Sequence, residues 1–152
     1  MSHHIVPATE PLLRAIAPRL RAADRREVET LGFTPERGLL DSFHRSTWAR
    51  VALTPSGRPI AAWGLGLIST LGGIGGPWML STPLIERDRR AFLRESRRQV
   101  AEMHQLCPVL RGETDARYRG AVRWLGWLGF SFGAPVEIGG VPFLPFERVD
   151  HG

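Results

Sequence analysis

The sequence has one cysteine, no lysine and no long hydrophobic run, and each scarcity narrows what the protein can be. A single cysteine, Cys107, cannot form an internal disulfide, so the fold does not depend on a disulfide framework. No apolar run approaches the ~20 residues that cross a bilayer, and the N-terminus lacks a basic segment followed by an apolar one. We therefore expect a protein without membrane spans that resides in the cytoplasm.

The charge is positive because 20 basic residues, all of them arginine, face 15 acidic ones, which gives a formal net charge of +5. This balance would suit nucleic acid, an acidic partner or the phosphates of coenzyme A. No recognised nucleic-acid motif accompanies the arginines, so nucleic-acid binding through Arg87, Arg90, Arg94 and Arg97 ranks last among these options.

Length and composition predict one ordinary globular domain. The 152 residues can bury roughly two thirds of the surface of the unfolded chain, and we expect a single domain over residues 1–152. Cys107 has one close histidine, His104, but nothing like a protease signature surrounds the two. We therefore interpret the cysteine as a small apolar filler rather than a nucleophile.

The clearest pattern lies in residues 75–130. Residues 75–80 are apolar and are bounded by glycines and by Ser81-Thr82-Pro83, which predicts a strand. The apolar spacing beyond it predicts a helix that is capped by Ser81 or Thr82 and runs to about His104. The residues expected on its buried face are Phe92, Leu93, Ser96, Val100 and Met103.

A second strand is expected from Val109, followed by a helix capped by Thr114 or Asp115. Its expected buried stripe consists of Ala121, Val122, Leu125 and Leu128. A strand, a helix, a strand and a helix in this order predict a parallel strand pair with a right-handed crossover.

The flanking segments are predicted from the same signals. Thr9 and Thr34 are expected to cap two short helices, and a third helix is expected from Pro18 to about Leu31. Pro142 and Pro145 predict an edge position for the last strand. The other expected elements are a strand over 5–8, a hairpin of 48–53 with 60–68, a glycine-rich hairpin connection over 71–76, and closing strands over 131–133, 136–138 and 141–146.

The run from Ala121 to Phe130 resembles the last helix of the Gcn5-related N-acetyltransferase (GNAT) superfamily, whose pattern is Asn-x-x-Ala-x-x-Leu-Tyr-x-x-x-Gly-Phe. The resemblance implies an α/β fold with a central twisted, mostly antiparallel sheet, one parallel strand pair and helices on both faces. It also implies acetyl-CoA as donor. Tyr118 stands in the position of the family's asparagine. Leu125 stands in that of the tyrosine often used as general acid.

A larger departure lies at the turn between the expected strand and helix. The family carries Arg/Gln-x-x-Gly-x-Gly/Ala there, so that bare backbone amides surround the pyrophosphate. This chain has Glu86-Arg87-Asp88-Arg89-Arg90-Ala91, with Arg89 in the place of the middle glycine. A side chain at that position holds phosphates away from the amides. Arginine side chains would have to bind the phosphates instead.

A second resemblance covers most of the chain. Four elements, in order, are similar to a family of tailed-phage and prophage proteins that includes the small internal virion protein of T7-like short-tailed phages. The elements are the charged block 21–27, the strand exit 77–82, the arginine-rich helix 87–98 and the closing run 123–130. This resemblance implies a GNAT-like fold with an eroded cofactor loop. It also implies a place in the host bacterial cytoplasm or the virion.

Two main hypotheses follow. In the first, the protein acts in virion assembly or infection by binding other phage proteins, and no cofactor is expected. Its contact residues would be Asp24, Glu27, Arg94, Arg97 and Trp127. In the second, it is an N-acetyltransferase that moves an acetyl group from acetyl-CoA to an amine, with Glu113 or a water as catalytic base. Asp24 and Glu27 are further acids that could enter the site from the N-terminal helix. The expected cofactor-binding residues are Leu80, Thr82, Arg87, Arg89 and Arg90. No metal site is expected.

Overall fold

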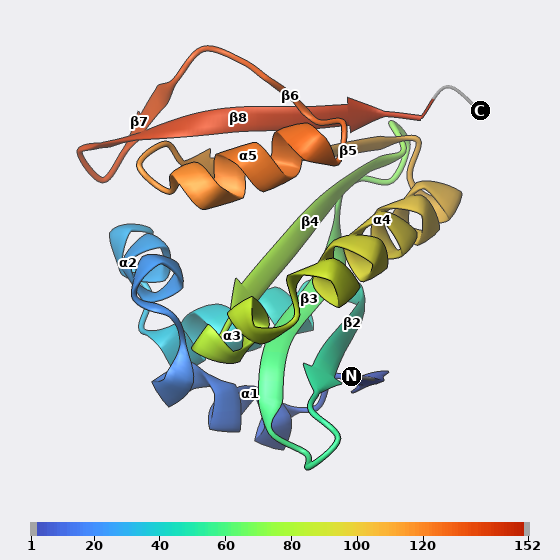
Figure 1. Cartoon of the computed structure of the whole chain (residues 1–152). Helices are drawn as coiled ribbons and strands as arrows, with labels where there is room; N and C mark the ends of the chain where they lie inside the picture. Colours follow the sequence, from blue (N-terminus) through green and yellow to red (C-terminus); the bar gives the residue numbers. More distant parts are fainter. Residues whose placement is uncertain (1–2, 151–152) are drawn as a thin grey trace.

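The computed structural model describes residues 3–150, which form one eight-stranded sheet with helices on both faces (Figure 1). The strands lie in the order β1-β2-β3-β4-β5-β8-β6, and β7 also pairs with β8. All neighbouring pairs are antiparallel except β4 and β5, which are parallel. The predicted α/β architecture, a mostly antiparallel sheet with one parallel pair, is confirmed.

The strands are β1 (His4–Pro7), β2 (Ser46–Leu53), β3 (Pro59–Ser69), β4 (Ile74–Ser81), β5 (Val109–Asp115), β6 (Ser131–Phe132), β7 (Val136–Ile138) and β8 (Val141–Val149). The α-helices are α1 (Glu10–Ile16), α2 (Ala22–Thr30), α3 (Pro35–His44), α4 (Arg89–Leu106) and α5 (Arg119–Trp127). Two short 3₁₀ helices, η1 (Ala17–Arg19) and η2 (Pro83–Arg87), precede α2 and α4.

The N-terminal helices begin at the predicted caps. The hydroxyl of Thr9 accepts from the amide of Leu12, and that of Thr34 accepts from the amide of Arg37. The predicted helix from Pro18 to Leu31 is instead broken at Leu20, whose ψ of 145° is extended. The amide of Arg21 donates to the carbonyl of Ser81 at 2.9 Å, so this break joins the start of α2 to the end of β4.

Two other boundaries differ from the prediction. The helix expected from Pro83 is a 3₁₀ turn capped by Thr82, and the long helix α4 begins only at Arg89, with Asp88 as its cap. Thr114 and Asp115 are the last residues of β5 and do not cap α5. The carboxylate of Asp115 accepts hydrogen bonds from Arg117 instead, because the chain first makes a turn there.

The predicted edge position of the last strand is wrong. β8 lies between β5 on one side and β6 and β7 on the other. The prolines are tolerated because neither removes a ladder hydrogen bond. The carbonyl of Pro145 points to Gly133, in the gap between β6 and β7, and that of Pro142 points to Ala116, beyond the end of β5.

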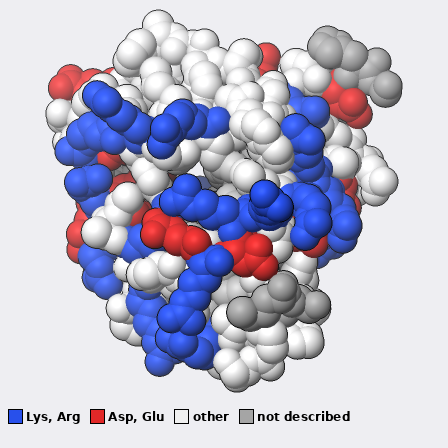
Figure 2. Space-filling model, viewed as in Figure 1, with Lys and Arg blue, Asp and Glu red and all other residues white. Residues whose placement is uncertain are grey.

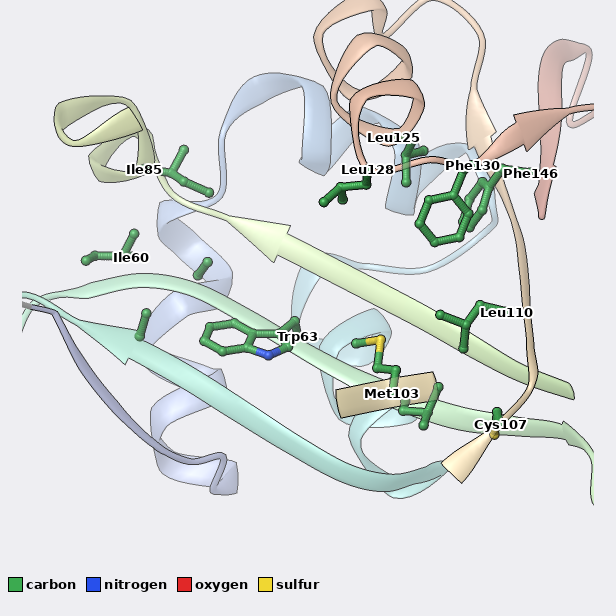
Figure 3. Close-up of a cluster of buried hydrophobic side chains, with 13 residues drawn as sticks. Ile60, Trp63, Ile85, Met103, Cys107, Leu110, Leu125, Leu128, Phe130 and Phe146 are labelled. Atoms are coloured by element: carbon green, nitrogen blue, oxygen red, sulfur yellow. The ribbon is translucent and has the colours of Figure 1, made fainter. Parts of the chain in front are cut away.

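The core is divided between the two faces of the sheet. One cluster packs α1 and α3 against β2 and β3 around Leu13, Leu39 and Val51. The other packs α4 and α5 on the opposite face, and Trp63, Leu125 and Phe146 belong to it (Figure 3). The glycine-rich stretch is the β3–β4 connection, as predicted.

A buried amide joins α4 to the sheet. Gln99 is 8% exposed, and its Oε1 accepts from the indole Nε1 of Trp63 at 3.0 Å and from the guanidinium of Arg50 at 2.8 Å. Arg50 also pairs with Glu102 on the next turn of the helix. Gln99 therefore satisfies a buried donor on β3 and helps to hold a charge on β2.

Replacing Gln99 by leucine is expected to lower the free energy of unfolding by about 2 kcal/mol, because the buried indole N–H of Trp63 loses its acceptor. Urea denaturation followed by circular dichroism would measure the change. Gln105→Leu, at an exposed position of the same helix, is the matched control. Equal stability of the two variants would contradict the assigned role of Gln99.

Candidate active site

The parallel strands β4 and β5 part soon after they begin to pair. Their register joins only Ile74 to Val109 and Gly75 to Leu110. The next residue of β4 on that edge is Pro77, which has no N–H to continue the ladder. The sequence therefore opens the sheet at this point, and the two strands run on to Ser81 and Asp115 with a gap between them.

The gap exposes backbone groups of β4. The amide of Thr82 points to Ile60 on β3, whereas that of Ser81 points the opposite way, to Asp24. Successive residues of a strand direct their backbone groups to opposite edges. Met79 therefore directs its N–H and C=O into the gap, as Ser81 does.

A continuous cavity of about 1570 Å³ runs through the gap. On the face covered by α4 and α5 it is lined by Phe92, Trp124 and Met79. On the other face it is lined by Glu27 of α2 and by Leu80. One molecule could therefore enter from each face and meet a second one at the parted strands.

Helix α2 lies across the mouth of the gap, is bound to the end of β4 and faces the end of β5. At the β4 side, the carboxylate of Asp24 accepts from the hydroxyl of Ser81 at 2.7 Å and from its amide at 3.2 Å. The guanidinium of Arg21 lies 3.4 Å from the same carboxylate. Asp24 is only 6% exposed, and its burial raises its pKa despite these partners.

At the β5 side, α2 presents Glu27 to Asp115. The backbone of Asp115 lies beside the Glu27 carboxyl and acts to lower its pKa. Burial, and then the negative charges of Asp24 and Asp115, raise the pKa of Glu27 to about 7. Asp115 differs because the guanidinium of Arg117 holds its pKa below the usual range. Glu27 thus places at this mouth a carboxyl that would exchange a proton near neutral pH.

Arginines line the other entrance. Figure 2 shows a hollow in this face of the molecule, with basic side chains on both sides of it. The arginines that line the cavity on this face are Arg89, Arg94 and Arg98 from the α4 segment and Arg123 from α5. Such a rim favours a ligand with several negative charges.

The N-terminus of α4 is capped by the side chain of Asp88. The Oδ1 of Asp88 accepts from the amide of Ala91 at 3.2 Å, and this hydrogen bond lowers the pKa of the carboxyl. The carboxylate therefore lies at the helix N-terminus, where a phosphate would otherwise bind. Arg87, Arg89 and Arg90 are exposed beside it.

Of the two predicted cofactor-binding residues at the end of β4, one faces the cavity and the other is bonded within the fold. Leu80 lines the cavity. The hydroxyl of Thr82 is buried and donates to the carbonyls of Pro59 and Ile60, at 3.0 and 3.1 Å, so it serves the fold. Leu125 of α5 is buried in the core. Tyr118, just before α5, lines the cavity with the Arg21 guanidinium 5.1 Å from its ring centroid.

The predicted base and the predicted contact residues fall in different places. Glu113 is exposed on β5 and lines the cavity. Arg94 and Arg97 are exposed on α4, and the Arg97 guanidinium lies 3.9 Å from the ring centroid of Trp127, which is 41% exposed. These residues do not meet Asp24 and Glu27, which lie within the mouth of the gap.

Residues that the sequence did not single out complete the site. Trp124 stacks on Phe92, with centroids 5.4 Å apart, and its indole donates to the hydroxyl of Ser96 at 3.2 Å. These contacts join α5 to α4 along the cavity wall. Helical spacing predicted Phe92 and Ser96 only as buried positions; their pairing with α5 depends on the crossover.

Cys107 has the role expected of a filler. It is 1% exposed, and burial raises the pKa of its thiol. Nδ1 of His104 lies 2.9 Å from the carbonyl of Cys107 rather than at its sulfur. Within residues 3–150, no cluster of potential metal ligands occurs, and no helix is both long and apolar enough to span a bilayer.

Comparisons with known proteins give a clear answer for the fold. No family model matches the sequence, and no curated protein does. Among solved structures, the ribosomal-protein-S5-alanine acetyltransferase from Vibrio fischeri matches with a TM-score of 0.72 at 13% identity, over 99% of this chain and 94% of that one. The spermidine N-acetyltransferase from Vibrio cholerae, in complex with CoA and spermine, matches with 0.70 at 13%, over 97% and 95%.

Aminoglycoside acetyltransferase AAC(6')-Ib in complex with coenzyme A is similar to the same degree, with a TM-score of 0.70 at 15% identity, over 97% of this chain and 95% of that one. The chain therefore has a GNAT-like acetyltransferase fold over nearly its whole length, as the closing helix predicted. At these identities the likeness establishes the fold alone.

Proposed function

We propose that this protein transfers an acyl group, such as acetyl, from an acyl-CoA to an amine. The observation that carries the proposal is the gap between β4 and β5, into which Met79 directs its backbone N–H and C=O. The pantetheine arm of CoA contains two amides and can pair with such a strand edge. The Met79 amide would then also lie where it can stabilise negative charge on a thioester oxygen.

The two entrances of the cavity suit two substrates of opposite charge. The arginine rim beside α4 and α5 fits the phosphates of CoA. At the entrance beside α2, Asp24 is paired with Arg21 and Asp115 with Arg117, and the carboxylate of Glu27 would attract a protonated amine. The similar acetyltransferases, two of them in complexes with CoA, support this assignment.

Calorimetric titration with acetyl-CoA and with CoA tests the proposal. We expect binding in the micromolar range, about −8 kcal/mol, and weaker binding after Arg94→Ser or Arg123→Ser. Arg37→Ser, at an exposed position on α3, is the control. Absence of binding to the unaltered protein would overturn the proposal. The departure at Arg89 is tested in the same titration by Arg89→Gly.

Asp88 should weaken donor binding, because its carboxylate lies at the helix N-terminus that a phosphate would occupy. Asp88→Asn keeps an acceptor for the amide of Ala91 and removes the charge. We expect CoA to bind roughly threefold to tenfold more tightly to this variant at low salt, and the gain to shrink as salt screens the repulsion. Unchanged or weaker binding would show that the phosphates lie elsewhere.

The binding role implied by the phage resemblance stays a prediction. The similar structures are acetyltransferases and do not bear on it. Two of its candidate contacts, Trp127 and Arg97, stack on each other at the surface and line a second, small hollow. A pull-down with Trp127→Ser as the comparison would test it.

A further inference from the structure

We infer that Glu27, on helix α2, is the catalytic base that removes the proton from the incoming ammonium group. This inference rests on the proposed function, and it moves the base from β5, where the sequence suggested Glu113, to a helix that crosses the mouth of the gap. It is argued from the position of α2, from the pairing of the neighbouring charges and from the cavity.

Helix α2 is bound to the end of β4 and faces the end of β5, so Glu27 has a defined place. The carboxylate of Asp24 accepts a hydrogen bond from Ser81 of β4, and the Glu27 carboxyl lies beside the backbone of Asp115 at the end of β5. The Glu27 carboxyl lines the cavity on the face opposite the arginine rim. Met79 lines the same cavity, so an amine that enters from the α2 side would find Glu27 and the strand edge at Met79 in one continuous space.

The neighbouring charges are already paired, which leaves Glu27 to do the chemistry. On α2, Asp24 is held by Ser81 and Arg21. On the β5 side, Asp115 is held by Arg117, and Arg26 also acts on it electrostatically. Within the described part of the chain, Glu27 forms no ion pair with an arginine.

Its ionisation also fits the task. Burial and the charges of Asp24 and Asp115 raise the pKa of Glu27 to about 7, so near neutral pH it can both accept and release a proton. Glu113 is exposed instead and would face competition from water.

The proton and bond changes are as follows. The Glu27 carboxylate takes one proton from R–NH₃⁺ and leaves R–NH₂. The amine nitrogen attacks the thioester carbon and forms the C–N bond, and the C–S bond then breaks. The second proton passes from that nitrogen to the leaving thiolate and gives CoA–SH. Glu27 returns its proton to water, so the products are the amide, the thiol and one proton.

The test compares Glu27→Gln with Glu29→Gln, an exposed position on the same helix. Thiol release from acetyl-CoA is followed with spermidine, which is protonated at neutral pH, and with hydroxylamine, which is already neutral there. We expect Glu27→Gln to lower kcat/KM for spermidine by about 100-fold. The loss with hydroxylamine should be below tenfold, because no proton needs to be removed before attack.

Nuclear magnetic resonance of protein carrying ¹³C in the glutamate carboxyls gives a second readout that needs no turnover. The Glu27 signal, assigned by its loss in Glu27→Gln, should titrate near neutral pH. A Glu27 pKa in the ordinary glutamate range would overturn the inference, as would equal losses with both nucleophiles or no loss with either. If the unaltered protein neither binds acetyl-CoA nor releases thiol, the proposed function itself fails.

Discussion

Asp24→Ala is expected to lower the free energy of unfolding by about 3 kcal/mol, one of the two largest effects predicted for a single substitution in this protein. The carboxylate is 6% exposed and accepts from both the amide and the hydroxyl of Ser81. Alanine would leave a buried backbone N–H without an acceptor and remove the contact that fixes α2 to β4. Chemical denaturation at pH 7 would measure the loss.

Three comparisons locate the effect. Ser81→Ala should cost less, because it removes the hydroxyl but keeps the amide donor. Asp24→Asn keeps an acceptor oxygen and should also cost less than alanine. Asp41→Ala breaks a largely exposed ion pair between Asp41 of α3 and Arg45, just after the helix, and should change stability by under about 0.5 kcal/mol. A loss in Asp24→Ala no larger than that of Asp41→Ala would rule out the anchoring role.

Loss of the contact between Asp24 and Ser81 should also affect the site around Glu27. With α2 detached from Ser81, the mouth of the gap would lose the helix that carries Glu27. Hydrogen exchange at the Ser81 amide should therefore accelerate in Asp24→Ala, and the Glu27 pKa should move toward its ordinary value as water enters. Both changes can be measured on the same labelled protein.

The sequence predicted most of the elements because local signals decide them. Helices α1 and α3 begin at the threonine caps that were predicted. The apolar spacing of residues 92–103 predicted the face of α4 that packs on the core. The resemblance of the last helix to that of the GNAT superfamily predicted the fold. The boundaries that failed were those set by distant partners: α2 begins late because Arg21 pairs with Ser81, 60 positions along the chain.

The site was harder to predict for the same physical reason. The residue types that open the sheet were visible, since Pro77 cannot continue a ladder, but only the register shows which edge it faces. Asp24 and Glu27 are three residues apart and so share a helix face. Their burial depends on where that helix packs, and burial is the main cause of the raised pKa of Glu27. Glu113 was predicted as the base because it lies near the exit of a strand. In the structure its side chain is exposed.

The second large effect concerns pH. The pKa of Glu27 is about 7 in the folded protein, against 4.5 for the ordinary side chain. The folded state therefore holds the proton more tightly, and unfolding between these values releases it. Stability from this group is full below pH 4.5, falls as the pH rises through 7, and is lost above it.

Glu27→Gln should abolish this fall. Relative to the unaltered protein, the variant should gain up to about 3 kcal/mol of unfolding free energy between pH 4.5 and pH 8, with most of the gain complete just above neutral pH. Denaturation at a series of pH values would measure it, with Glu29→Gln as the control that should follow the unaltered protein. A constant difference across the range would mean that Glu27 titrates normally.

The stability change and the catalytic inference can be separated. If Glu27→Gln is more stable at pH 8 and also loses turnover with spermidine, the protein retains a destabilising carboxyl at the place where a base is needed. If the variant is more stable and turnover is unchanged, the raised pKa is a consequence of burial alone, and Glu113 or a water molecule becomes the next candidate. A gain in stability together with normal acetyl-CoA binding would also exclude unfolding as the cause of any loss of activity.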